Sequence, residues 1–147
     1  MPGGPDHIVH VAGDLDALSD IYARAGFTVG VRNRHPFGTH NRIIQLDEFY
    51  FELLAIAEPE RIQPHGPQAF SFGAYNRDFL KLHEGLSMLL LKSSNAAADA
   101  GAFDAAGIGG FKTFDFAREG KRPDVSVVKL AFSLAFAQDP ASPDVRL

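Results

Sequence analysis

The sequence predicts a single α+β domain built from two similar halves. Residues 6–56 read as a strand, a helix and three further strands. After a linker at 57–74 rich in proline and glycine, residues 75–147 give a second strand, helix, strand and strand behind a first short helix. The chain of 147 residues is 46% hydrophobic and holds 13 Phe, which is enough for one domain with a hydrophobic core. We therefore expect one domain over residues 1–147.

Composition excludes several classes of function. The formal net charge is -4 and basic residues are scattered, so no surface for nucleic acid is predicted. Cysteine is absent, which excludes disulfides, thiolate metal sites and a cysteine nucleophile. No apolar run approaches the roughly 20 residues that span a bilayer. We expect a soluble protein with no membrane partner, located in the cytoplasm.

The first strand and helix are marked by a short stretch around two histidines. Ile8, Val9 and Val11 are β-branched, and residues 7–12 are apolar apart from His7 and His10. Because side chains alternate along a strand, His7 shares a face with Val9 and Val11, and His10 points to the other face. Asp14 is placed to cap a helix over 15–25, whose apolar residues recur three and four apart and which ends at Gly26.

Three more strands are predicted at 27–31, 40–46 and 49–56, separated by a polar turn at 32–39 and a break at 47–48. Glu52 is unusual, because it lies between Phe51 and Leu53 in the most apolar of these strands. A buried carboxylate needs a cation, a metal or hydrogen-bond donors. The alternative is that Glu52 is solvated or pairs with an arginine such as Arg42.

The second half repeats this order but is shorter by one strand. A helix is predicted at 75–84, a strand at 86–92, a helix at 96–106 capped by 93–95, and strands at 110–117 and 125–137. The segment 145–147 is too brief to count as a strand. Three explanations stay open: the chain is a piece of a longer protein, the strand begins where the sequence ends, or a partner chain completes the sheet edge.

Several motifs of the first half resemble the glyoxalase-like branch of the vicinal oxygen chelate superfamily. They occur in the family's order at Asp6–Val9, Asp14–Asp16, Ala25–Phe27, His35–Arg42 and Tyr50–Leu54. The resemblance implies paired βαβββ modules, one at about 6–56 and one at about 75–147, whose mixed β-sheet curls around a cup. The second module then lacks its last strand.

The resemblance also implies a metal site. In metal-dependent members the first strand supplies a histidine and the last strand a glutamate, which fall on His7 and Glu52. Imidazole and carboxylate suit Zn, Fe, Mn, Ni or Co. The second module offers no matching histidine, since the corresponding slot falls near Ser87, so the expected ligand set is incomplete. Other groups that could complete it are His35, His40, His65 and Gln45.

The candidate site contains further residues. Glu52 is expected to act in catalysis as well as in metal binding, and Asn41, Arg42 and Tyr50 are candidates for substrate binding. For Arg42 a plain surface arginine is an equal alternative. His35 and His40 lie at the cup rim or are simply solvated, and His10 is expected to face the helix.

Two functions, and a weaker third, are compatible with these residues. The first is a divalent-metal-dependent enzyme of the lyase, isomerase or dioxygenase type, acting on a small oxygenated substrate. The second is a metal-free protein that binds or sequesters small molecules, as bleomycin-resistance relatives do. The third is a fold kept for assembly only. By resemblance, a homodimer is also expected.

Overall fold

The computed structural model of the protein describes residues 3–122, 124 and 126–142. Its strands are β1 (Pro5–Val11), β2 (Asn33–Arg34), β3 (Thr39–Gln45), β4 (Tyr50–Ile56), β5 (Gly85–Leu91), β6 (Phe114–Lys121) and β7 (Val127–Leu134). Its α-helices are α1 (Leu15–Arg24), α2 (Phe72–Leu80) and α3 (Ala96–Ala105), and a short 3₁₀ turn lies at Pro59–Arg61.

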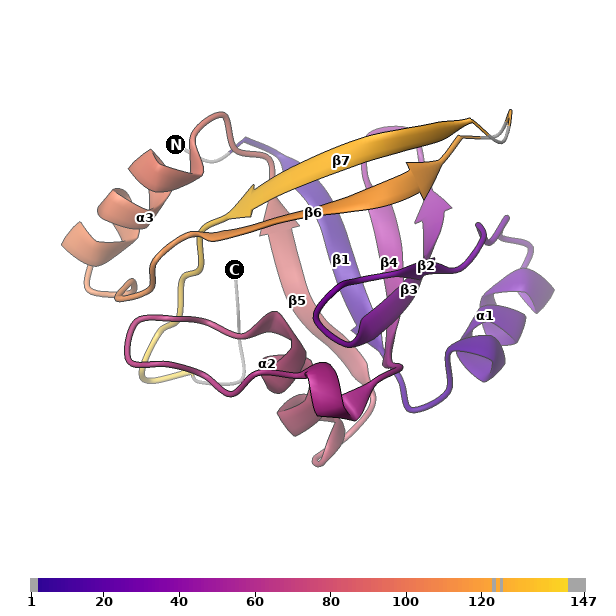
Figure 1. The fold of residues 1–147 in the computed structure, drawn as a ribbon, viewed down its shortest axis with the longest axis horizontal. Helices are drawn as coiled ribbons and strands as arrows, with labels where there is room; N and C mark the ends of the chain where they lie inside the picture. Colours follow the sequence, from indigo (N-terminus) through magenta and orange to yellow (C-terminus); the bar gives the residue numbers. More distant parts are fainter. Residues whose placement is uncertain (1–2, 123, 125, 143–147) are drawn as a thin grey trace.

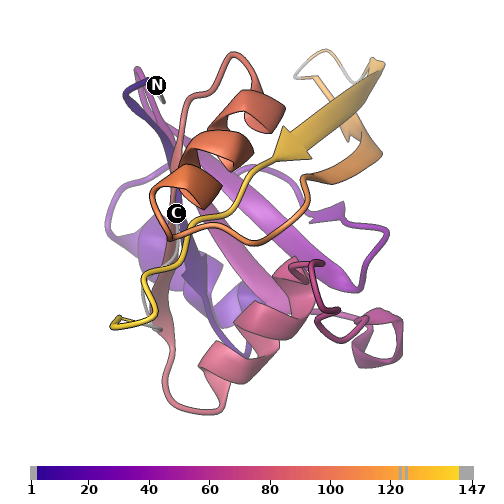
Figure 2. The ribbon, with the colours of Figure 1, turned by 90° about the vertical axis from the view of Figure 1, so that its left-hand side faces the viewer.

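The strands form one five-stranded sheet and one separate hairpin. The sheet has the order β2-β3-β4-β1-β5, in which β1 runs parallel to β4 and antiparallel to β5. The hairpin consists of β6 and β7. Figure 1 shows this hairpin crossing in front of the large sheet, with α1 and α3 at opposite ends of the molecule. Figure 2, turned by 90°, shows the hairpin held away from the sheet on one side.

The two faces of the sheet have different partners. Leu53 and Ile44 point to the face that α1 covers, where they join Leu15 and Leu18 in one buried cluster. Val9, Val11 and Leu54 point to the other face. There they pack with side chains of α2, β5 and the segment after β7, chiefly Phe72, Tyr75, Phe79, Met88 and Phe136. Strand alternation therefore assigns every residue of β1, β3 and β4 either to the α1 side or to the hairpin side.

Most of the predicted elements are confirmed, within a few residues at their ends. Asp14 caps α1 by accepting hydrogen bonds from two backbone N–H groups, and Asn95 caps α3 in the same way with one. The helix predicted from residue 75 begins earlier, because the Ser71 side chain accepts a hydrogen bond from the Ala74 N–H and so caps the helix there. As a result Asn76 lies inside the helix and is fully buried.

The strand predicted at 27–31 is wrong. This segment makes one backbone hydrogen bond to β3, from the Gly30 N–H to the Ile43 carbonyl, and the regular pairing occurs later at β2. Two of its apolar residues contact the α1 side instead, whereas Val31 is exposed. The Phe27 ring contacts Tyr22 edge to face, and Val29 packs against the cluster beneath the helix. The β6 strand also begins at Phe114 rather than at residue 110.

The predicted fold class is confirmed: the protein is a mixed α+β structure with a curled mixed sheet. In the part of the chain that the structure describes, the second half contributes β5, β6 and β7 and no fourth strand. β5 and β7 do not pair with each other. The segment 145–147 lies outside the described residues. No described helix is both long and apolar enough to cross a membrane.

Candidate functional site

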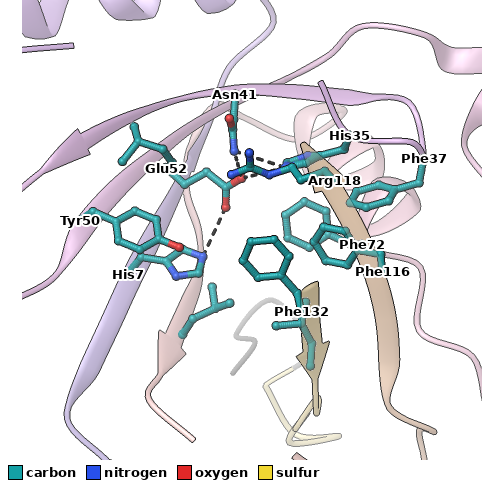
Figure 3. Close-up of a pocket in the computed structure, with 13 residues that line it drawn as sticks. His7, His35, Phe37, Asn41, Tyr50, Glu52, Phe72, Phe116, Arg118 and Phe132 are labelled. Atoms are coloured by element: carbon teal, nitrogen blue, oxygen red, sulfur yellow. Dashed lines mark hydrogen bonds and ion pairs between the residues drawn. The ribbon is translucent and has the colours of Figure 1, made fainter. Parts of the chain in front are cut away.

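A cup opens between the five-stranded sheet and the hairpin. Its floor comes from the hairpin side of the sheet, with His7 on β1, Asn41 on β3, and Tyr50 and Glu52 on β4. Its roof comes from the hairpin, with Phe116, Arg118 and Phe132. The cavity measures about 50 Å³, which is room for a few water-sized groups. Figure 3 shows the polar floor residues facing these rings across the cup.

The Glu52 carboxylate lies at the centre of the floor and is 6% exposed. Its Oε1 accepts a hydrogen bond of 2.6 Å from Asn41 Nδ2, and its Oε2 lies 3.3 Å from His7 Nε2. His35 Nε2 lies 3.7 Å from Oε1. Burial alone would raise the pKa of Glu52, but the contacts with His7, His35 and Asn41 outweigh burial and hold this pKa well below its ordinary value. Glu52 is therefore ionised at neutral pH.

His7 is held between two carboxylates and against an aromatic ring. Its Nδ1 lies 2.7 Å from Asp6 Oδ2, and its ring stacks on Tyr50 with centroids 4.3 Å apart. Burial opposes the charged imidazole, but Glu52 and then Asp6 outweigh it, so the pKa of His7 is raised. The His7–Glu52 contact therefore has the character of a buried ion pair. Tyr50 stays a neutral phenol, because burial and the charge of Glu52 raise its pKa.

His35 forms the wall of the cup and is neutral. Its Nδ1 lies 2.7 Å from Thr39 Oγ1, and its Nε2 lies 3.3 Å from Asn41 Nδ2. Since the Asn41 amide donates, Nε2 accepts, and the ring proton is assigned to Nδ1. Burial lowers the pKa of His35 against the opposing charge of Glu52. The Asn41 carbonyl in turn accepts from Asn33 Nδ2, at 3.1 Å, so this side chain is fixed on both sides.

Aromatic rings enclose the polar floor. Phe37 stacks on His35 with centroids 4.9 Å apart and meets Phe116 edge to face at 5.0 Å. Phe116 stacks on Phe132 at 4.8 Å, and Phe72 closes the wall behind Phe37 at 5.8 Å. The cup thus combines a charged pair at its base with an apolar lining, the composition typical of sites for small molecules.

The structure brings together all but one of the predicted site residues. His7, Asn41, Tyr50 and Glu52 line the same cavity. Arg42 does not, because it points to the α1 side of the sheet, where Nη2 pairs with Asp16 at 3.3 Å and Nη1 donates to the Gly30 carbonyl. The expected place of Arg42 at the site is thus corrected, since consecutive residues of a strand face opposite ways.

Ser87, the position expected to correspond to His7 in the second module, does not line the cup. The Ser87 hydroxyl donates to Asn76 Oδ1 at 2.6 Å and is buried below α2. The β5 residue that lines the cup is Leu90, which pairs with His7. Of the other histidines, His10 faces α1 as expected, where it hydrogen-bonds the Tyr22 hydroxyl at 2.7 Å.

The sequence did not lead us to predict Arg118 as a site residue, and it placed His35 only at the cup rim or in solvent. Arg118 continues the alternation of Phe114 and Phe116 along β6, but the sequence pattern predicts an end of this strand at Ala117. Extending the alternation by one step would have found it. His35 lies in a turn, where no periodicity predicts which way a side chain points.

The divalent metal that the family implies finds an incomplete ligand set. A metal bound at about 2.0–2.2 Å to an imidazole and a carboxylate holds their atoms about 3.4 Å apart in tetrahedral geometry. The separation of His7 Nε2 and Glu52 Oε2, 3.3 Å, fits that value. Asp6 also orients the far side of the His7 ring, as carboxylates do for histidine ligands. Yet across residues 3–122, 124 and 126–142 no group of three His, Asp or Glu is arranged to hold a metal.

Comparison with known proteins identifies the fold. The pattern of the glyoxalase-like domain family matches residues 6–147. No curated protein matches the chain. A hypothetical protein from Staphylococcus aureus has 19% identity and a TM-score of 0.72 over 93% of this chain, which spans only 53% of that protein.

Two enzymes have a similar fold. Streptomyces coelicolor methylmalonyl-CoA epimerase, in complex with 2-nitronate-propionyl-CoA, shares 18% identity with a TM-score of 0.62, over 100% of this chain and 94% of the epimerase. Methylmalonyl-CoA epimerase from Mycobacterium tuberculosis shares 15% identity with a TM-score of 0.60, over 97% of this chain and 83% of the epimerase. These likenesses show the vicinal oxygen chelate fold. With the family match over residues 6–147, they show that this chain belongs to the glyoxalase-like domain family.

Proposed function

We propose that this protein is an isomerase- or lyase-type enzyme that binds a small oxygenated substrate in the cup and moves a proton next to its carbonyl group. The observation that carries the proposal is the buried Glu52 carboxylate, which faces the cavity between two imidazoles. A fixed carboxylate that faces the cavity is in reach of a C–H bond of a bound molecule, which is the first requirement for a general base. The similar fold of methylmalonyl-CoA epimerases, which are isomerases, supports this reaction class.

The chemistry follows from the charges of the floor. Glu52 accepts a proton from the carbon next to the carbonyl, and the electron pair of that C–H bond moves toward the carbonyl oxygen. The His7 imidazole is placed to donate a hydrogen bond to the resulting oxyanion, while the Asn41 amide holds the Glu52 carboxylate in position. A substrate oxygen that takes over the His7 hydrogen bond also removes it from Glu52, which raises the basicity of this carboxylate. Return of the proton to carbon completes an isomerisation.

The test is exchange of carbon-bound protons with solvent, which can be followed whatever the product is. Aldehydes, ketones and thioesters with an acidic C–H bond are incubated in D₂O, and loss of the proton signal is followed by NMR. We expect Glu52→Gln to slow exchange by about 100-fold or more. Glu48→Gln is the matched control, because Glu48 is exposed in the turn before β4, and this variant should keep the wild-type rate. Equal rates in wild type and Glu52→Gln would contradict the proposal.

A divalent metal at His7 and Glu52 is a separate proposal for the same residues. The 3.3 Å separation and the Asp6 contact support it, whereas the incomplete ligand set opposes it. Elemental analysis of the purified protein decides. About one Zn, Fe, Mn, Ni or Co ion per chain, lost in His7→Ala, would support the metal. Absence of stoichiometric metal after reconstitution with each ion would contradict it.

Binding without catalysis is the alternative function, and the aromatic lining of the cup supports it. Tight binding of an aromatic ligand with no proton exchange in any substrate class would favour a protein that sequesters small molecules. A homodimer and a cytoplasmic location also remain proposals from the family resemblance. Light scattering of the purified chain tests the first, and cell fractionation tests the second.

A further inference from the structure

Arg118 places a positive charge in the roof of the cup. It lies on β6 opposite Leu130, and its side chain lines the same cavity as Glu52 and His7. Its guanidinium carbon lies 5.6 Å from the centre of the Phe132 ring, which holds the group against an aromatic face. Figure 3 shows the guanidinium reaching from the hairpin into the cup.

This guanidinium is short of partners. No carboxylate among the described residues forms an ion pair with it. Its Nη1 makes a single long hydrogen bond, of 3.4 Å, to the Glu119 carbonyl. Its Nε is buried and has no hydrogen-bond partner in the described part of the chain. A buried donor without an acceptor is costly, so a ligand that supplies an acceptor gains free energy there.

The charges that face the cup add to this argument. His7 pairs with the carboxylates of Glu52, at 3.3 Å, and of Asp6, at 2.7 Å. Among the residues that line the cup, Arg118 is the charged side chain for which the described residues supply no ion-pair partner. A neutral substrate would leave it unpaired, whereas an anionic one would neutralise it.

We infer that the substrate is a small carboxylic acid whose carboxylate binds Arg118. The Nε–Nη2 edge of a guanidinium is planar and offers two parallel donors, which match the two oxygens of a carboxylate. The Nε of this edge is the atom that lacks a partner. Phe116 and Phe132 would cover the apolar body of the acid, and its carbonyl end would reach Glu52 and His7 on the floor. This inference rests on the proposed function for the role of the floor and goes beyond it in naming the substrate class.

Matched ligands separate charge from shape. Acetate against acetamide, and propionate against propionamide, are titrated into the protein and followed by ¹H–¹⁵N NMR, with inorganic phosphate as a further anion. We expect each carboxylate to bind and each neutral amide to bind at least about tenfold more weakly. Equal binding of acid and amide would overturn the inference. Tighter binding of phosphate than of either carboxylate would overturn the carboxylate assignment.

Variants locate the binding. Arg118→Gln should weaken carboxylate binding by about tenfold or more, and Arg118→Lys, which keeps the charge but loses the planar pair of donors, should weaken it less. Lys129→Gln is the control, since it removes the same charge from the exposed side of the same hairpin, and it should bind as wild type does. Unchanged affinity in Arg118→Gln would overturn the inference.

The failure of this inference can be told from the failure of the proposed reaction. Glu52→Gln removes a negative charge from the cup, so it should bind carboxylates at least as tightly as wild type even though proton exchange is lost. Carboxylate binding through Arg118 with no exchange in wild type would leave the inference standing and reject the reaction. Proton exchange in neutral carbonyl compounds at a rate that Arg118→Gln does not change would support the proposed reaction and reject the inference about Arg118.

Discussion

Leu90 lies directly across from His7 in the antiparallel pairing of β5 with β1. Both side chains line the cup. In such pairs the Cβ atoms are about 4.5–5.5 Å apart, so the two side chains reach the same small volume. The strand that enters from the second half therefore presents a hydrocarbon to the His7–Glu52 pair, and the incomplete ligand set has a specific structural cause.

Replacing this residue should improve metal binding. Leu90→His places a second imidazole beside His7 and Glu52 and raises the number of ligands from two to three. We expect the affinity for Zn²⁺, measured by calorimetry, to rise by about tenfold or more. Leu89→His is the control, because Leu89 points to the other face of β5. Equal affinity in the two variants would show that the cup geometry does not support metal coordination.

The histidines of the cup should titrate on opposite sides of the ordinary value of 6.5. The pKa of His7 lies above it, because Glu52 and Asp6 outweigh burial, and the pKa of His35 lies below it, because burial dominates. NMR titration of the ring protons measures both. In Glu52→Gln we expect the pKa of His7 to fall. A His7 pKa that is unchanged in this variant would mean that the two residues do not form an ion pair.

The same pair should stabilise the fold within a limited range of pH. The raised pKa of His7 gives stability that is complete below about 6.5 and is lost as the pH rises through the folded value. The lowered pKa of Glu52 gives stability that is present above about 4.5 and is lost as the pH falls. The difference in free energy of unfolding between wild type and Glu52→Gln should therefore be largest between these values, at about 1–3 kcal/mol. Urea unfolding at acid, intermediate and alkaline pH measures it, and a difference that grows toward alkaline pH would contradict the ion pair.

Ser87 should matter for stability and not for the site. Its hydroxyl satisfies the fully buried Asn76 Oδ1 at 2.6 Å. Ser87→Ala leaves this acceptor without its partner, which should cost about 1–3 kcal/mol of unfolding free energy in a urea titration. Ser94→Ala changes an exposed serine and should cost under about 0.5 kcal/mol. Loss of ligand binding in Ser87→Ala at full stability would instead assign this residue to the site.

Gly38 should tolerate no side chain. Its φ is +92°, and an added Cβ would lie 2.5 Å from the Glu58 carbonyl oxygen. Gly38→Ala should therefore destabilise the protein by more than about 1 kcal/mol. Gly101→Ala provides the contrast, because Gly101 lies within α3 with open space around it, and this variant should stabilise the helix by about 0.5–1 kcal/mol. Thermal unfolding checks the prediction: the Tm should fall in Gly38→Ala and rise in Gly101→Ala.

Strand alternation accounts for most of what could be predicted of the site. It places His7 with Val9 and Val11, and Glu52 with Tyr50, on the hairpin side of the sheet, as the structure confirms. The same rule argues against choosing both Asn41 and Arg42, because neighbours in a strand cannot face one cavity. That error was avoidable from the sequence alone.

Other features depend on contacts between distant segments. Phe27 and Val29 are strand-like residues, but α1 offers them an apolar surface, so they contact Tyr22 and the cluster beneath the helix without regular pairing. His35 enters the cup because the turn folds back over β3, where Thr39 and Asn41 bind both ring nitrogens. Such tertiary contacts override local propensity.

The separate pairing of β6 with β7 has a consequence for how a ligand reaches the floor. Within the described residues, the hairpin shares no backbone ladder with the five-stranded sheet, and its contact with the cup is through side chains such as Phe116 and Phe132. Lifting the hairpin therefore breaks ring contacts but no ladder of backbone hydrogen bonds. We therefore expect a molecule to enter or leave the cup at a rate that depends on the parting of these rings, and its residence time to change with the size of the aromatic side chains.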